Sequence, residues 1–117
     1  MEQFDHDKLD VYQTAVDWVS LAQDIVEALP RGNGNLADQL QRAAASVTLN
    51  IAEGAGEFSG AEKARFYRIA KRSATECAAV LDVANRRSAI SHQHHSQGRA
   101  LLLRIVSMLV KLARMHS

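Results

Sequence analysis

Cysteine, proline and aromatic residues are scarce in this sequence, and each scarcity excludes a class of protein. Cys77 is the only cysteine, which excludes an internal disulfide framework. One proline and six glycines in 117 residues are too few for a disordered or low-complexity chain. Aromatic residues make up 5% of the chain, so its core must consist of Leu, Ile, Val and Ala, which favours packing of helix on helix.

Long apolar runs are also missing from the sequence. None approaches the roughly 18–20 residues that are needed to span a bilayer. The first ten residues, MEQFDHDKLD, are acidic and lack the basic start and apolar centre of a signal peptide. We therefore expect a cytoplasmic protein of bacterial type that does not associate with a membrane.

The net charge of +1 hides a strong asymmetry along the chain. Residues 1–57 carry ten acidic and three basic side chains, whereas residues 58–117 carry three acidic and eleven basic ones. One interpretation is that acidic helices pack beside basic helices and that their charges balance. The other is a basic surface that meets phosphate or an acidic partner.

Apolar residues recur at helical spacing in four segments, which are separated by three breaks. The breaks are residues 30–34 (PRGNG), 54–60 (GAGEFSG) and 88–98 (SAISHQHHSQG). We expect helices over residues 7–29, 35–54, 59–87 and 97–115, in a single domain of residues 1–117. Short connections make successive helices antiparallel, so the expected fold is an all-α, up-down four-helix bundle.

The most regular segment is residues 39–54, QLQRAAASVTLNIAEG. Small and apolar residues occupy one side of it, and beside them runs a polar line of Gln39, Arg42, Ser46, Asn50 and Glu53. Gly54 is expected to end this helix in the left-handed conformation. If the polar line is buried, we expect it to meet Ser73 and Glu76 on the next helix. If it lies at a subunit junction, the carboxylates would pair with Arg42 or Arg72.

The segment 59–87 begins with a capping box, Ser59 to Glu62, and carries a basic stripe opposite its apolar side. The stripe consists of Arg65, Arg68, Arg72 and Arg86, with Lys71 beside it and Arg87 beyond its end. Such a row fits a phosphate backbone, and these six residues are our candidate nucleic-acid contacts. The alternative is a solvated face, partly paired with acids of the first helix or of a neighbouring subunit. No aromatic residue is interleaved with the stripe to stack a base.

The last expected helix, residues 97–115, is apolar around roughly two-thirds of its circumference at 100° per residue. Its polar strip consists only of Arg104, Ser107, Lys111 and Arg114. A helix that packs against a single bundle needs less apolar width than this. The excess predicts a second contact, most simply with another copy of the chain, so we expect a homo-oligomer.

No catalytic or metal-binding pattern stands out. His92, His94 and His95 lie in the segment expected to be a loop, have no cysteine or carboxylate ligands nearby, and are expected in solvent. GAGEFSG departs from the dinucleotide fingerprint, because no strand precedes it and its third glycine is one place late. Cys77 is expected to be a small buried hydrophobe. We therefore expect a protein that is not an enzyme and that holds no cofactor and no metal.

The central third of the chain resembles the signature of the 23S rRNA-intervening-sequence proteins, also called four helix bundle proteins. That signature reads approximately QLRRAA-SI--NIAEG, then a serine-led helix, then IA-GS--E. The matching signature positions include Arg42, Ser46, Asn50, Glu53, Gly54, Ser73 and Glu76. Lys71 and Arg72 stand where the family often has a small residue or glycine before the serine, which adds charge.

The resemblance implies an up-down four-helix bundle that assembles as a ring, typically a pentamer. The chain is also similar to the accessory proteins of diversity-generating retroelements, whose basic ring surface binds nucleic acid and a reverse transcriptase. Two hypotheses follow. The first is a non-catalytic homo-oligomer that binds RNA or DNA through a basic surface. The alternative is an oligomeric scaffold for a protein partner, in which the charges serve assembly.

Overall fold

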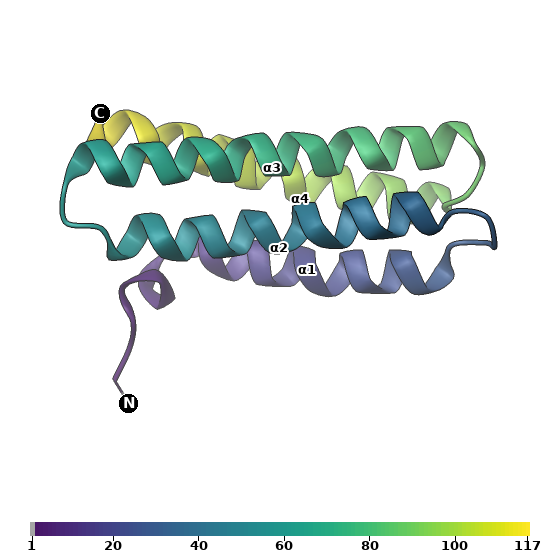
Figure 1. Ribbon diagram of the computed structural model, residues 1–117, viewed down its shortest axis with the longest axis horizontal. Helices are drawn as coiled ribbons and strands as arrows, with labels where there is room; N and C mark the ends of the chain where they lie inside the picture. The colour runs from purple at the N-terminus through teal and green to yellow at the C-terminus, as the bar shows by residue number, and fades with distance from the viewer. Residues whose placement is uncertain (1) are drawn as a thin grey trace.

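The computed structural model describes residues 2–117, which form four long helices around one core (Figure 1). A short 3-10 turn, η1 (Asp5–Lys8), precedes them. The helices are α1 (Asp10–Ala28), α2 (Gly34–Gly56), α3 (Gly60–Arg86) and α4 (His92–His116). Each of them packs against the next in the chain, and α4 also packs against α1, so α1 and α3 lie diagonally across the bundle. The expected all-helical bundle is confirmed.

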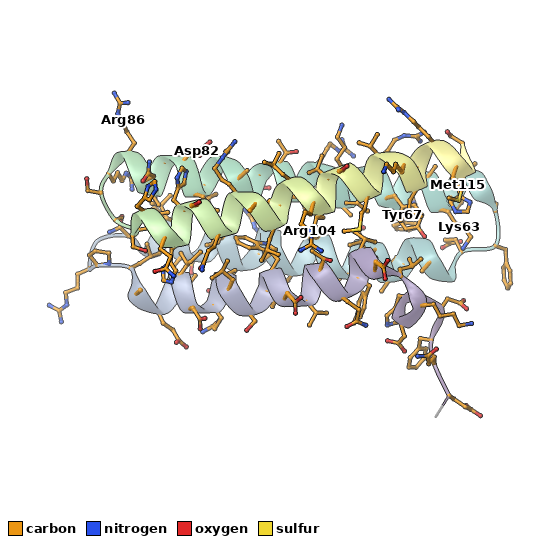
Figure 2. The ribbon with its side chains drawn as sticks, turned by 180° about the vertical axis from the view of Figure 1, so that it is seen from behind. Lys63, Tyr67, Asp82, Arg86, Arg104 and Met115 are labelled. Carbon is orange, nitrogen blue, oxygen red and sulfur yellow. The ribbon has the colours of Figure 1, made fainter. Side chains whose placement is uncertain are left out.

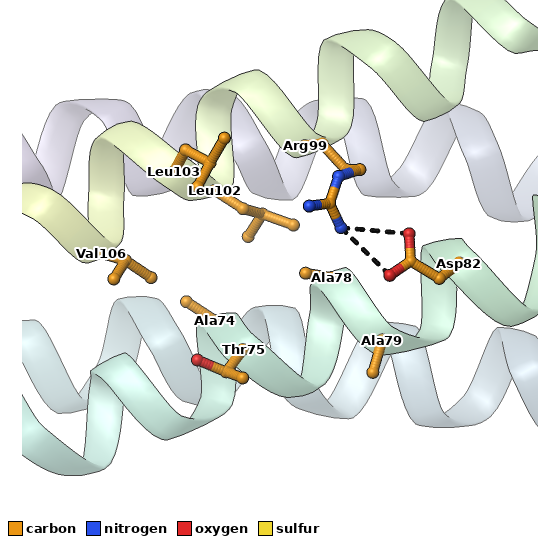
Figure 3. Close-up of a pocket in the computed structure, with 9 residues that line it drawn as sticks. All are labelled: Ala74, Thr75, Ala78, Ala79, Asp82, Arg99, Leu102, Leu103 and Val106. Carbon is orange, nitrogen blue, oxygen red and sulfur yellow. Dashed lines mark hydrogen bonds and ion pairs between the residues drawn. The ribbon is translucent and has the colours of Figure 1, made fainter.

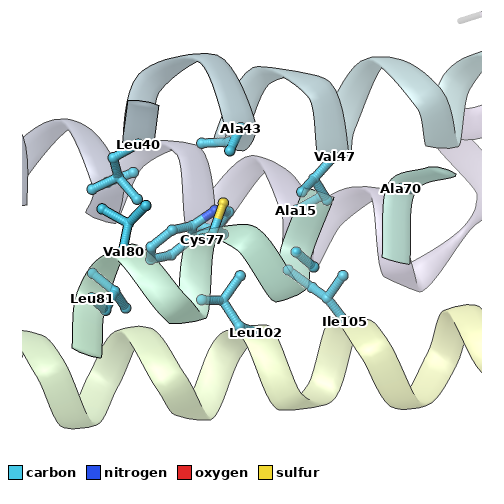
Figure 4. Close-up of a cluster of buried hydrophobic side chains, with 14 of the residues drawn as sticks. Ala15, Leu40, Ala43, Val47, Ala70, Cys77, Val80, Leu81, Leu102 and Ile105 are labelled. Atoms are coloured by element: carbon cyan, nitrogen blue, oxygen red, sulfur yellow. The ribbon is translucent and has the colours of Figure 1, made fainter. Parts of the chain in front are cut away.

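The core is built mainly from aliphatic side chains, and its buried aromatic residues are Trp18 on α1 and Tyr67 on α3. Leu40 on α2, Leu81 on α3 and Ile105 on α4 belong to the same buried cluster (Figure 4). Burying one such side chain stabilises the fold by about 1.5–3 kcal/mol. Between these large residues the helices present alanines, which allow the backbones to approach closely: Ala15, Ala43, Ala70 and Ala74.

Gly54 has a different role from the one predicted, because α2 continues through it to Gly56 and its φ angle is not positive. A Cβ atom at Gly54 would lie 2.8 Å from Cε1 of Tyr67 and 3.1 Å from Cβ of Phe66. The glycine therefore allows α2 and α3 to pack closely, and the prediction of a left-handed helix end was wrong. Beyond it, the ammonium of Lys63 donates a hydrogen bond of 2.8 Å to the carbonyl oxygen of Ala55.

The fourth helix starts earlier than predicted. It begins at His92 and not at residue 97, because Ser91 caps it: the Ser91 hydroxyl accepts a hydrogen bond of 3.0 Å from the His94 amide. Gly98 does not break this helix. It is buried where a Cβ would lie 2.6 Å from Cδ1 of Leu81. The prediction of a loop over residues 88–98 was therefore wrong for its second half.

The other helix ends differ by a few residues from the predicted ones. Residues 5–8 form the separate turn η1, and α1 begins at Asp10 with Leu9 as its N-cap, so the predicted helix 7–29 is too long at both ends. The predicted helix 35–54 extends to Gly34–Gly56. Ser59 caps α3 as expected, through a hydrogen bond of 3.0 Å from the Glu62 amide. The Glu62 carboxylate does not complete the capping box and pairs with Arg65.

Candidate nucleic-acid interface

The polar line of α2 meets α3 over its central part. The hydroxyls of Ser46 and Ser73 share a hydrogen bond of 2.8 Å across the interface between the two helices. The Asn50 amide supports this contact, since its Nδ2 donates to the Ser46 carbonyl oxygen at 2.8 Å and to the Ser46 hydroxyl at 3.1 Å. These half-buried groups bond to one another, as buried polar groups must.

The ends of the polar line lie at the surface. Arg42 and Glu76 form an exposed ion pair of 3.4 Å between α2 and α3. Glu53 is exposed and makes no ion pair with any residue in the range 2–117. The signature residues therefore connect α2 to α3 at the centre of their interface, and this part of the chain offers no open chemical site.

Four of the predicted contact residues lie together on the outer side of α3. They line one shallow hollow of about 420 Å³ and are named here the cation cluster: Arg65, Arg68, Lys71 and Arg72. With a rise of 1.5 Å per residue, the cluster extends for about 10 Å along the helix. Four positive side chains thus surround a surface that is open to solvent.

Most of this positive charge has no partner among residues 2–117. Arg65 pairs with Glu62 at 3.2 Å, and its guanidinium lies 4.5 Å from the centre of the Phe66 ring. Arg68, Lys71 and Arg72 make no ion pair or side-chain hydrogen bond within residues 2–117. Free guanidinium and ammonium groups at this spacing are suited to bind phosphate.

The other two predicted contacts, Arg86 and Arg87, lie apart from the cation cluster. Arg86 is fourteen residues from Arg72, which corresponds to about 21 Å along a helix. Figure 2 shows Arg86 at one end of the bundle and Tyr67, which neighbours the cluster in sequence, toward the other end. Glu76 and Asp82 interrupt the stripe between the two groups. The six residues therefore do not form one continuous surface.

A basic residue of α4 joins this surface, and the sequence did not single it out as a contact. Arg114 lines a hollow between α3 and α4 together with Arg68, Lys71 and Tyr67. The signal in the sequence was the polar strip of the last helix, which consists almost entirely of cations. Placing that strip beside the cation cluster required knowing that α3 and α4 are neighbours.

His94 and His95 are less exposed than predicted, because their segment is helical, whereas His92 is exposed as predicted. Nε2 of His95 lies 2.9 Å from the Asp82 carboxylate, and Nη1 of Arg99 donates to both oxygens of Asp82 at 3.1 Å (Figure 3). The hydrogen bond with His95, and then the charge of Arg99, lower the pKa of Asp82 despite some desolvation. The prediction that His95 lies in solvent was therefore wrong. Its contact with Asp82 connects the start of α4 to α3.

Other reactive groups lie in unreactive surroundings. Cys77 is fully buried, and burial raises its pKa to about 12, so its thiol stays protonated at neutral pH. Within the described part of the chain, no three His, Cys, Asp or Glu side chains gather where they could hold a metal ion. No helix among residues 2–117 has the length and apolar character to cross a bilayer.

These features define the class of protein: an all-helical bundle whose polar signature residues bond to one another between α2 and α3, and whose α3 carries a cluster of exposed cations on its outer side. The family model described as "23S rRNA-intervening sequence protein" matches residues 7–111. The chain belongs to that family. No curated protein matches it.

The fold has a counterpart among solved structures. It is similar to a protein of unknown function from the S23 ribosomal protein family of Bacteroides thetaiotaomicron VPI-5482, with a TM-score of 0.81 and 18% sequence identity. The alignment covers 88% of this chain and 97% of the other. At this identity the likeness concerns the fold alone.

Proposed function

We propose that this protein is a non-catalytic, homo-oligomeric module that binds RNA through the cation cluster. The observation that carries the proposal is that Arg68, Lys71 and Arg72 lie side by side around one hollow with no anionic partner in the described chain. Like charges repel one another when they are gathered, and a polyanion removes that repulsion. Neutralising phosphates also releases the counterions condensed on the nucleic acid.

The chemistry of the cluster predicts binding that does not depend on the base sequence of the RNA. Arginine and lysine contacts to phosphate fix the position of a nucleic acid but do not distinguish its bases. Of the two aromatic rings beside the cluster, Tyr67 is buried, and the guanidinium of Arg65 lies over one face of Phe66, which leaves little room for a base to stack. We therefore expect recognition of the backbone, with a strong dependence on salt.

Self-association is the second part of the proposal. Leu103 and Met115 on α4 remain exposed after the bundle has formed, and Val106 and Val110 are only half buried. These residues are the part of the wide apolar surface of α4 that its own bundle does not use. The proposal also includes a closed ring of five copies, which the family resemblance implies. It includes a location in the cytoplasm, which the composition suggests.

The binding of a generic single-stranded RNA, followed by fluorescence anisotropy at about 50 mM salt, tests the RNA role, because electrostatic binding is strong at low salt. The test variant replaces Arg68, Lys71 and Arg72 by alanine. Its matched control removes the same number of exposed cations elsewhere, at Lys8, Arg31 and Arg104. We expect the cluster variant to bind much more weakly and the slope of log K against log salt to fall by about 2–3 units, roughly one for each lost phosphate contact.

Two results would overturn the RNA role of the cation cluster. One is the absence of binding by the unmodified protein at low salt. The other is an equal loss of affinity in the cluster variant and the control, which would mean that net charge alone drives the interaction. In the first case, with the oligomer intact, the alternative function is favoured: an oligomeric scaffold that receives a protein partner. In the second case, RNA binding would stand but would not be located at the cation cluster.

A further inference from the structure

An apolar groove runs between α3 and α4, beyond the cation cluster (Figure 3). It encloses about 330 Å³ and is named here the α3–α4 groove, with the lining residues Thr75, Ala78, Ala79, Leu102, Leu103 and Val106. Leu103 is 62% exposed in its wall. Its only charged residues are Asp82 and Arg99, which neutralise each other at one end. The groove therefore favours an apolar occupant over a nucleic acid.

Beyond its two ends, the α3–α4 groove is flanked by positive charge. Arg86 follows it on α3, and Arg114 follows it on α4 toward the opposite end of the bundle, where Met115 lies in Figure 2. Neither guanidinium makes an ion pair within residues 2–117. A fitting partner thus has an apolar centre between acidic ends.

The outer face of α1 has this pattern. Val16 and Val19 are 42% and 38% exposed near the middle of the helix. The only charged residues of α1 are acids, and they lie beside and on both sides of the valines: Asp10, Asp17, Asp24 and Glu27. None of these acids makes an ion pair in the described chain. The helix therefore combines an exposed apolar centre with negative charge that the bundle leaves unpaired.

We infer that the outer face of α1 of one copy docks into the α3–α4 groove of the next. The apolar centre supplies most of the affinity, and the charges beyond it set the direction and the rate of docking, since charges at the rim of an interface add little energy. The two surfaces are different, so the contact is heterologous and passes from copy to copy, which produces a closed ring or a filament. This inference rests on the self-association proposed above. It adds the two surfaces that make the contact, the outer face of α1 and the α3–α4 groove.

Light scattering coupled to size-exclusion chromatography at micromolar concentration tests this contact with three variants. Leu103→Glu places a carboxylate in the groove, and Val16→Lys places an ammonium on α1. Leu49→Glu is the matched control, since Leu49 on α2 is 64% exposed and belongs to neither face. We expect each of the first two variants to associate about tenfold or more weakly than the unmodified protein, as for a central interface residue. The control is expected to assemble normally.

Mixing the two defective variants gives the sharper result. Each keeps one working face, so an equimolar mixture is expected to form a one-to-one dimer, in which α1 of the Leu103→Glu variant docks into the groove of the Val16→Lys variant. If the unmodified protein is a monomer, the proposed self-association is itself wrong. An oligomer that survives Leu103→Glu, an oligomer that survives Val16→Lys, or a mixture that forms no dimer would leave self-association standing and overturn the assignment of the faces. Thermal unfolding followed by circular dichroism confirms that each variant is folded.

Discussion

The two sides of α3 differ in whether their polar side chains have partners. On the side that faces α2, the Ser73 hydroxyl has a partner 2.8 Å away on Ser46, and Glu76 pairs with Arg42. On the outer side, Arg68 and Arg72 have no partner within residues 2–117. The first side holds the family signature, and the second holds the candidate binding residues. The residues that identify this family are therefore not the ones that we expect to bind.

Desolvation explains the difference. A half-buried hydroxyl that loses its partner costs about 1–3 kcal/mol, so a polar group between helices is stable only when it is paired. An exposed guanidinium keeps its hydration and costs nothing when it is unpaired. Folding thus requires complete hydrogen bonding at the α2–α3 interface, whereas the outer side of α3 is free to serve an external ligand.

The largest effect on stability is expected at Gly54. In Gly54→Ala the new Cβ would press against the buried ring of Tyr67, and overpacking of this kind costs about 1–3 kcal/mol. Gly56→Ala is the control, because nothing lies within 4 Å of its Cβ position, and it gains up to about 1 kcal/mol of helix propensity. The free energy of unfolding in urea measures both. Equal stability of the two variants would mean that helix packing does not require Gly54.

The hydrogen bond between Ser46 and Ser73 is expected to have a smaller effect. Ser46→Ala and Ser73→Ala each leave a half-buried hydroxyl without its partner across the interface, whereas the double variant removes both groups. A double-mutant cycle of unfolding free energies is expected to give a coupling of about 0.5–1.5 kcal/mol. RNA affinity is expected to stay unchanged in all three variants. Additive effects on stability would show that the contact contributes nothing of its own.

The smallest effect is expected at Asp82, whose ion pair is exposed. Its pKa is lowered in the folded state, so its contribution is present above the ordinary carboxyl pKa of about 3.9 and is lost as the pH falls through the lower folded value. Asp82→Asn is expected to cost less than about 1 kcal/mol at pH 7. The difference from the unmodified protein should vanish in strong acid.

Asp38→Asn is the control for this pH dependence, because Asp38 is an exposed acid of α2 that makes no ion pair in the described chain. Denaturant unfolding across the acid range measures all three proteins. A difference between Asp82→Asn and the unmodified protein that is the same at pH 7 and in strong acid would contradict the assigned role of the carboxylate.

Sequence reasoning succeeded where a property repeats along the chain. The apolar period of 3.6 residues predicted four helices, and the spacing of the basic residues on α3 placed Arg65, Arg68 and Arg72 on one face. The serine at position 59 predicted the start of α3, because a side-chain cap is a local interaction. Each of these features depends on neighbours within about two turns of helix.

Sequence reasoning failed where a glycine has a neighbour far along the chain. Gly54 and Gly98 both looked like helix breaks, but each lies inside a helix at a point where a second helix comes too close for a Cβ atom. Glycine permits both situations, and its surroundings alone decide between them. The supposed loop before Gly98 was wrong for the same reason.

By itself, the sequence determined the class of fold, the family and the separation of charge between the two halves of the chain, since all three follow from the order of residue types. Only the tertiary structure decided which of these charges meet. It paired Arg99 with Asp82, placed Arg114 beside the cation cluster and set Arg86 apart from that cluster. Such contacts depend on which helices are neighbours, and that is settled by packing across the bundle.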